Sequence, residues 1–120
     1  MNEKQFIGKL GENKAEKYLK DNGYIIIDKN YYCRFGEIDI VATDLETGEI
    51  VFIEVKTRTN LSFGMPIDSI NYNKIKHLTK AINYYIIDKK LYRNNIRVDA
   101  IEVFVRARNH CINHIKRIIQ

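Results

Sequence analysis

Residues 52–58, FIEVKTR, place a glutamate and a lysine two positions apart inside a run with the composition of a buried strand. Because side chains on a strand alternate between its two faces, Glu54 and Lys56 share one face. In an earlier segment of the same type, EIDIVATD, alternation places Asp39 on the face opposite to Ile38 and Ile40. Asp39 comes beside Glu54 if the two strands pair in the right register. Two carboxylates that close repel each other, and burying them is costly unless a cation neutralises them.

Mg²⁺ is the natural cation for such a pair, because it prefers oxygen ligands and is commonly held by one or two carboxylates plus substrate phosphates. The carbonyl of Val55, between the two polar residues, is a further candidate ligand. Lys56 would orient or deprotonate the nucleophile, or stabilise negative charge on a phosphate under attack. These residues predict phosphodiester hydrolysis with Mg²⁺, for which we expect Mn²⁺ to substitute. The alternative is a Glu54–Lys56 ion pair on a solvated sheet face, worth less than about 1 kcal/mol.

Seven elements are expected to position these residues. Apolar residues at spacings of three and four predict helices over residues 3–22 and about 68–89. Alternating apolar segments bounded by turns predict strands over residues 24–32, 37–44, 50–58, 95–107 and 111–119. The first three strands have connections too short for crossovers, so they form an antiparallel meander, and the last two form a hairpin. The order α-β-β-β-α-β-β predicts a mixed α/β domain.

Length and composition favour one domain in the cytoplasm. The chain has 120 residues, of which 45% are hydrophobic, which is enough for one core and not for two. The N-terminus is polar, and no apolar run approaches the ~18–20 residues of a membrane span, so we expect no membrane contact. Cys33 and Cys111 are expected to be free, buried thiols. The net charge of +5 is compatible with nucleic acid without requiring it.

The segments GEID at 36–39 and FIEVKTR at 52–58 resemble the D-x(n)-E-x-K signature of the PD-(D/E)xK nuclease superfamily. More closely, the chain resembles the uncharacterised UPF0102 family, whose YraN-type members are similar to archaeal Holliday junction resolvases. The resemblance extends to GKLGENKAEKYLKDNGY near the start and IRVDAIEV near the end, where the family's usual RFD is RVD. It implies a restriction-endonuclease-like α/β fold, with a central mixed sheet flanked by helices.

The resemblance also implies roles for individual residues. Asp39, Glu54 and Lys56 match the core motif, with the two carboxylates as metal ligands. Glu12, in the first helix, matches an acidic residue that would bind metal directly or through water. An exposed helical position is the alternative for Glu12, and Glu37 belongs either to the turn or to the surroundings of the site.

Several further residues are candidates for contacts with nucleic acid. Surface charge is the alternative for each of four basic residues: Arg34, Arg58, Lys74 and Lys76. The eight tyrosines would mostly pack, although some are placed to stack on unpaired bases. His77, His110 and His114 lack ligand spacing and are expected at the surface or in packing.

Together, motif and resemblance predict a nucleic-acid-binding protein that cleaves DNA as a Mg²⁺-dependent endonuclease, with branched DNA as a candidate substrate. Branched DNA has two strands to cut, so a two-fold homodimer is a reasonable arrangement. The alternative is a catalytically silent nucleic-acid-binding accessory module of a DNA- or RNA-processing complex. A weaker third hypothesis is a structural partner protein whose acidic cluster is incidental.

Overall fold

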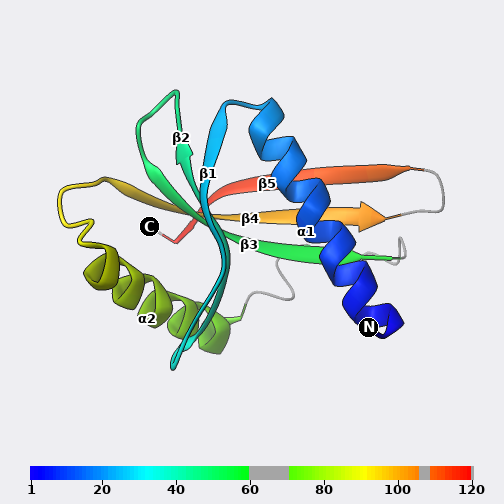
Figure 1. Cartoon of the computed structure of the whole chain (residues 1–120), viewed down its shortest axis with the longest axis horizontal. Helices are drawn as coiled ribbons and strands as arrows, with labels where there is room; N and C mark the ends of the chain where they lie inside the picture. The colour runs from blue at the N-terminus through cyan, green and yellow to red at the C-terminus, as the bar shows by residue number, and fades with distance from the viewer. Residues whose placement is uncertain (60–70, 106–108, 120) are drawn as a thin grey trace.

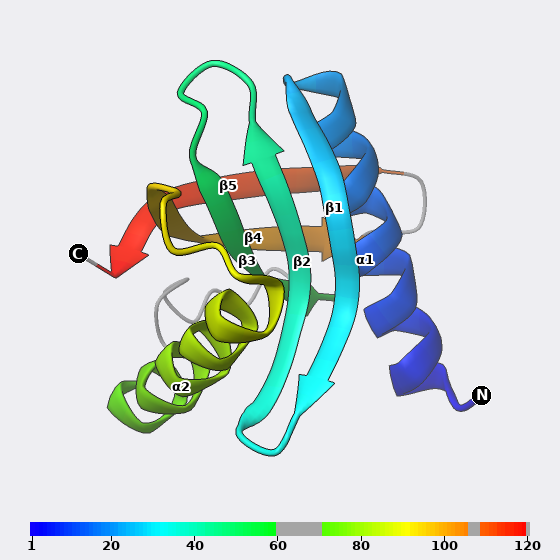
Figure 2. The ribbon, with the colours of Figure 1, turned by 60° about the vertical axis from the view of Figure 1, so that its left-hand side comes forward.

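The computed structural model describes residues 1–59, 71–105 and 109–119. Its strands form one sheet in the order β1-β2-β3-β4-β5. Their bounds are Tyr24–Cys33, Gly36–Asp44, Ile50–Arg58, Ile96–Val105 and His110–Ile119. Helices α1 (Glu3–Asp21) and α2 (Tyr72–Lys89) lie on opposite sides of this sheet (Figures 1 and 2). The predicted element order and the restriction-endonuclease-like α/β architecture are confirmed.

The pairing directions follow from the connections. Strands β1, β2 and β3 pair antiparallel through short turns, as predicted. Strand β4 pairs parallel to β3, because the segment containing α2 carries the chain back across the sheet. Strand β5 then returns antiparallel along β4 and forms one edge of the sheet. The sheet is therefore mixed, and β3 lies at its centre.

Each face of the sheet carries its own apolar core. In β3, Val51 and Ile53 pack towards α1, whereas Phe52 packs towards α2. This strict alternation places Glu54 and Lys56 on the α2 side, in line with Phe52, as the sequence predicts. Strand β3 therefore has buried apolar positions at its start and polar positions, on one face, towards its end.

Strand β2 departs from the predicted alternation. Ile38 and Ile40 were expected on the same face, but Ile40 packs in the α1 core and Ile38 packs in the α2 core with Val41. Opposite the break, Asn30 of β1 has a left-handed φ of 52°. That conformation interrupts the regular pleat, so the predicted face of Ile38 is wrong, whereas Asp39 still lies beside Glu54.

Local side-chain chemistry sets the helix starts. Helix α1 begins with a capping box, in which Asn2 and Gln5 exchange backbone-to-side-chain hydrogen bonds of 2.8 and 3.1 Å. Helix α2 begins at Tyr72 rather than near residue 68, because Asn71 has extended backbone angles and caps the helix by accepting the N–H of Lys74 at 2.9 Å. Residues 68–70 lie outside the described residues, as do Pro66 and Gly64.

Helix α1 crosses β3 in close contact. A Cβ atom on Gly11 would overlap the side chain of Thr57, so only glycine allows the two elements to approach this closely. Gly8, one turn earlier, has no atom within 4 Å of the corresponding position. The crossing therefore depends on Gly11 and fixes α1 against the end of β3 that carries the polar residues.

A buried cluster of charges ties the other end of the sheet together. Arg97 donates to Asp99 at 2.9 Å, to Asp44 at 2.8 Å and to the hydroxyl of Tyr24 at 2.6 Å. His114 Nε2 lies 2.8 Å from Asp99, so His114 is a bonded member of this cluster and not a plain surface or packing residue. Although burial opposes ionisation, His114 and Arg97 keep the pKa of Asp99 below its ordinary value. The RVD segment is thus a structural anchor.

Two remaining expectations concern the surface. Both cysteines are free, as predicted, but Cys111 is exposed because it lies on the edge strand β5, and Cys33 is only partly buried. Among the residues described, no helix is both long enough and apolar enough to pass through a membrane.

Candidate active site

The carboxylate of Asp39 stands where pairing between β2 and β3 stops. The paired positions run from Thr43–Ile50 to Ile40–Ile53, and the next step would align Asp39 with Glu54. Instead of a backbone pair, Oδ2 of Asp39 accepts the N–H of Val55 at 2.7 Å. The Asp39 side chain thus takes the place of a backbone acceptor. It is held beside Glu54, as the predicted register of the two strands places it.

Two lysines neutralise Glu54. Its Oε1 atom lies 3.5 Å from Nζ of Lys56, on the same strand, and 2.9 Å from Nζ of Lys74, in the first turn of α2. The Glu54 side chain is only 11% exposed. Because Glu54 is largely buried, solvent screens its charge less than it screens an exposed carboxylate, so these contacts shape the electrostatics of the site.

The surroundings shift the protonation of this group. Burial, and then the negative charge of Glu54, raise the pKa of Asp39 to about 7, against the hydrogen bond from Val55. Burial, and then the neighbouring Lys74, lower the pKa of Lys56, against the attraction of Glu54. A carboxyl group with a raised pKa beside a lysine with a lowered pKa is typical of catalytic sites.

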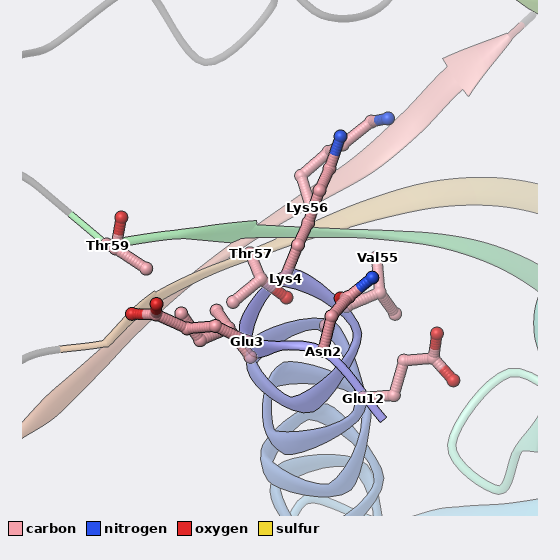
Figure 3. A pocket seen from close by; sticks show the side chains of 10 residues that line it. Asn2, Glu3, Lys4, Glu12, Val55, Lys56, Thr57 and Thr59 are labelled. Atoms are coloured by element: carbon pink, nitrogen blue, oxygen red, sulfur yellow. The ribbon is translucent and has the colours of Figure 1, made fainter.

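Cavities open on both sides of β3 at this point. Asp39, Glu54 and Lys74 line a cavity of about 450 Å³ together with Phe35 and His77, under the turn between β1 and β2. On the α1 side, a second cavity of about 740 Å³ is lined by residues of α1 and of β3, among them Glu12, Val55, Lys56 and Thr57 (Figure 3). The candidate residues therefore border open space into which a substrate could extend.

Glu12 is near the site but bonded elsewhere. The Asn30 amide, with its nitrogen facing the acids, donates to Glu12 at 3.0 Å and to Glu37 at 2.9 Å. Burial, and then the charge of Glu37, raise the pKa of Glu12. In Figure 3 the Glu12 carboxylate and the Lys56 ammonium point in different directions. Glu12 and Glu37 thus form a second acidic pair beside the first.

The donor set suits a hard cation held by two protein carboxylates. Within residues 1–59, 71–105 and 109–119, no group of three or more histidine, cysteine or acidic side chains is placed to hold a metal ion. Asp39, Glu54 and Glu12 are therefore not gathered into one ligand group. The two carboxylates of Asp39 and Glu54 suit Mg²⁺ without a third acid, because they offer oxygen donors and a cation would relieve their mutual repulsion. Ligation by the Val55 carbonyl stays a prediction.

The remaining basic candidates have different surroundings. Arg34 is exposed in the turn between β1 and β2, with its guanidinium 4.7 Å from the ring centre of Phe35. Arg58 lies 3.5 Å from the buried Glu102, on the next strand. Lys76 is exposed on α2. Only Lys74 is brought directly to the carboxylate pair, and its role as counter-ion was not foreseen.

Glu102 is a polar residue that sequence reasoning missed. It is 1% exposed and stands opposite Lys56 in the parallel pairing of β3 and β4. Its Oε1 accepts from Asn113 at 3.0 Å, and its Oε2 is the atom that lies 3.5 Å from the guanidinium of Arg58. The signal was present, because Ile-Glu-Val occurs at 101–103 as it does at 53–55.

Comparison with known proteins identifies close relatives along nearly the whole chain. The family model described as "Uncharacterised protein family UPF0102" matches residues 11–103. The UPF0102 protein of Caldicellulosiruptor bescii is 45% identical over 123 aligned positions, which cover 97% of this chain and 98% of that protein. Those of Alkaliphilus oremlandii and Dictyoglomus turgidum are 42% and 40% identical, covering 97% and 94% of this chain and 97% and 93% of their own. The chain therefore belongs to the UPF0102 family, as its motifs predicted.

Proposed function

We propose that this protein is a Mg²⁺-dependent endonuclease that hydrolyses DNA phosphodiesters, with branched DNA as a candidate substrate. The observation that carries the proposal is the hydrogen bond from Val55 N–H to Asp39, which holds one carboxylate beside the Glu54–Lys56 pair. Two neighbouring acids, a lysine and an adjoining cavity are parts that metal-assisted phosphodiester hydrolysis uses.

The roles follow from position. Asp39 and Glu54 would hold the cation, which when bound polarises the phosphate and makes water a better nucleophile. Lys56 would orient that nucleophile or accept its proton, and burial already lowers the pKa of Lys56 in support of this role. Lys74 lines the cavity, and Arg34 lies over the ring of Phe35, which also lines it, so both would meet substrate phosphates. Glu12 would act on the cation through water.

A cleavage panel tests the proposal directly. Labelled duplex, single-stranded, flap and four-way-junction DNA, and RNA, are incubated with Mg²⁺, with Mn²⁺ or with EDTA. We expect products from DNA only when a divalent cation is present. The variants Glu54→Gln and Lys56→Met should yield none, since each removes one charge and keeps most of the side-chain volume.

Matched controls separate chemistry from general charge effects. Glu46→Gln changes an exposed turn residue, and Lys80→Met changes an exposed residue of α2. Both controls should cleave like the unchanged protein. Cleavage that persists in Glu54→Gln would refute the proposed site, and so would cleavage that persists in EDTA.

The second candidate function is a nucleic-acid-binding module without catalysis. It is favoured by the 2.9 Å contact of Lys74 with Glu54, which already supplies Glu54 with a positive partner. It is also favoured by the lack of a three-member ligand group among the residues that the structure describes. Binding of DNA or RNA that survives in both site variants, with no products from any substrate, would establish this alternative.

The proposal extends to assembly and location. Two strands of a branched DNA would be cut by two sites, so we propose a two-fold homodimer acting in the cytoplasm. Sedimentation equilibrium with and without junction DNA measures the subunit number. A protein that stays monomeric on a junction it cleaves would contradict the dimer.

A further inference from the structure

The contact between Lys74 and Glu54 joins two elements that are far apart in sequence. Nζ of Lys74 lies 2.9 Å from Oε1 of Glu54, and Nζ of Lys56 approaches the same oxygen at 3.5 Å. The Lys74 side chain is 35% exposed, so it keeps one side open to the cavity that it lines with Asp39. A partly exposed ammonium thus stands beside the Asp39–Glu54 pair.

The helix itself gives Lys74 no reason to be there. Lys74 is the third residue of α2, and the first turn contains no acidic side chain. The positive end of the helix dipole disfavours a cation at that place. The anionic partner of Lys74 is therefore Glu54, 2.9 Å away on β3, and not a group of the first turn of its own helix.

We propose that Lys74 is the resident counter-ion of the Asp39–Glu54 pair and that a divalent cation must displace it from Glu54 in order to bind. The inference rests on the proposed function, because it assigns the cation to these carboxylates. A cation and an ammonium compete for the same oxygen, so the Lys74 contact weakens cation binding by the free energy of that contact.

Once displaced from Glu54, Lys74 would contact the substrate. Its long side chain lines the cavity, so an ammonium released from Glu54 is free to meet a phosphate there. Cation and nucleic acid would then bind with positive coupling, because each favours the state in which Lys74 has left Glu54. Such coupling is reciprocal, so a nucleic acid that engages Lys74 also tightens cation binding.

The test compares Mn²⁺ binding by calorimetry in the unchanged protein, Lys74→Met and Lys80→Met. Methionine keeps the apolar stem and removes the charge, and Lys80 is an exposed residue of the same helix. We expect Mn²⁺ to bind Lys74→Met about fivefold more tightly, as expected for loss of one partly exposed ion pair, with no change in Lys80→Met. Lys74→Gln gives a second measurement if the methionine variant does not fold.

A second readout needs no cation titration. In EDTA, Lys74→Met should melt below the unchanged protein, because the two carboxylates lose their counter-ion, and saturating Mn²⁺ should remove the difference. Lys80→Met should melt like the unchanged protein under both conditions. A Lys74→Met protein that melts normally in EDTA would contradict the counter-ion role.

The outcomes separate this inference from the proposed function. Equal Mn²⁺ affinity in the unchanged protein and Lys74→Met, with binding lost in Asp39→Asn, overturns the inference and leaves the metal site in place. Equal tightening in Lys74→Met and Lys80→Met reveals only a general charge effect and also overturns it. No Mn²⁺ binding in any protein overturns both proposals.

Discussion

Replacement of Asp39 by asparagine tests the central electrostatic feature of the site. Burial, and then the charge of Glu54, raise the pKa of Asp39 from 3.8 to about 7. Between about pH 4 and about pH 7, the folded protein therefore still holds a proton on Asp39 that the unfolded chain has already released. The stability that this proton contributes is fully present below the unfolded pKa and is lost as the pH rises through the folded pKa.

The magnitude follows from the same two values. At about 1.4 kcal/mol per pH unit, the difference between 3.8 and about 7 corresponds to about 4 kcal/mol. This is an upper limit, because Asp39 is only partly buried and lines an open cavity. Asparagine keeps an oxygen that can accept from Val55, so the substitution removes charge without removing the hydrogen bond. We expect Asp39→Asn to be about 1–3 kcal/mol more stable than the unchanged protein near pH 8.

Urea unfolding in EDTA measures this effect between about pH 5 and about pH 8. The chain has no tryptophan, so far-ultraviolet circular dichroism is the suitable signal. The unchanged protein should lose stability relative to Asp39→Asn as the pH rises. Asp21→Asn makes the same chemical change at a 60% exposed side chain and should stay within about 0.5 kcal/mol.

Two results would refute the reasoning. One is a difference between the two proteins that does not change with pH. The other is an Asp39→Asn protein that is less stable than the unchanged one near pH 8. Saturating Mn²⁺ adds an internal check, because it should stabilise the unchanged protein and leave Asp39→Asn unaffected.

Further predictions concern the frame that holds the site, and thermal or urea unfolding measures each of them. Gly11→Ala should lose about 1–3 kcal/mol because its methyl group would overlap Thr57, whereas Gly8→Ala should gain about 0.5–1 kcal/mol. Equal stability of the two alanine variants would contradict the close crossing. Arg97→Met should lose about 3–5 kcal/mol, because the buried carboxylates of Asp99 and Asp44 would lose the cation that they share. A loss below about 1 kcal/mol would mean that the buried cluster contributes little.

The fold was predictable because its signals are local. The boundaries of every element were predicted to within a few residues. The signals were strand alternation, the apolar stripes of both helices and the turn glycines at 23 and 48. The start of α2 was missed because it depends on which side chain caps the helix, and a periodic apolar pattern carries no information on capping. The face of Ile38 was missed because it depends on the left-handed backbone of Asn30 on the neighbouring strand.

Only the contacts between neighbouring strands of the site could be predicted from the sequence. Register follows from alternation, so the approach of Asp39 to Glu54 could be inferred. The contact of Lys74 with Glu54 depends on how α2 packs over β3, which no spacing in the sequence specifies. The link from Glu12 to Glu37 likewise depends on the conformation of Asn30. Tertiary packing, and not sequence period, decides these partners.

The charges of the site suggest an order of binding. Asp39 and Glu54 together carry at most two negative charges, and Lys56 and Lys74 together carry at most two positive charges, so this group is close to neutral without a ligand. A neutral pocket attracts neither a phosphate nor a cation strongly. A divalent cation bound to the two carboxylates would leave both ammoniums without their partner and make the pocket positive. Phosphate would then be drawn to the site only after the cation, which makes affinity for nucleic acid at this pocket depend on the metal.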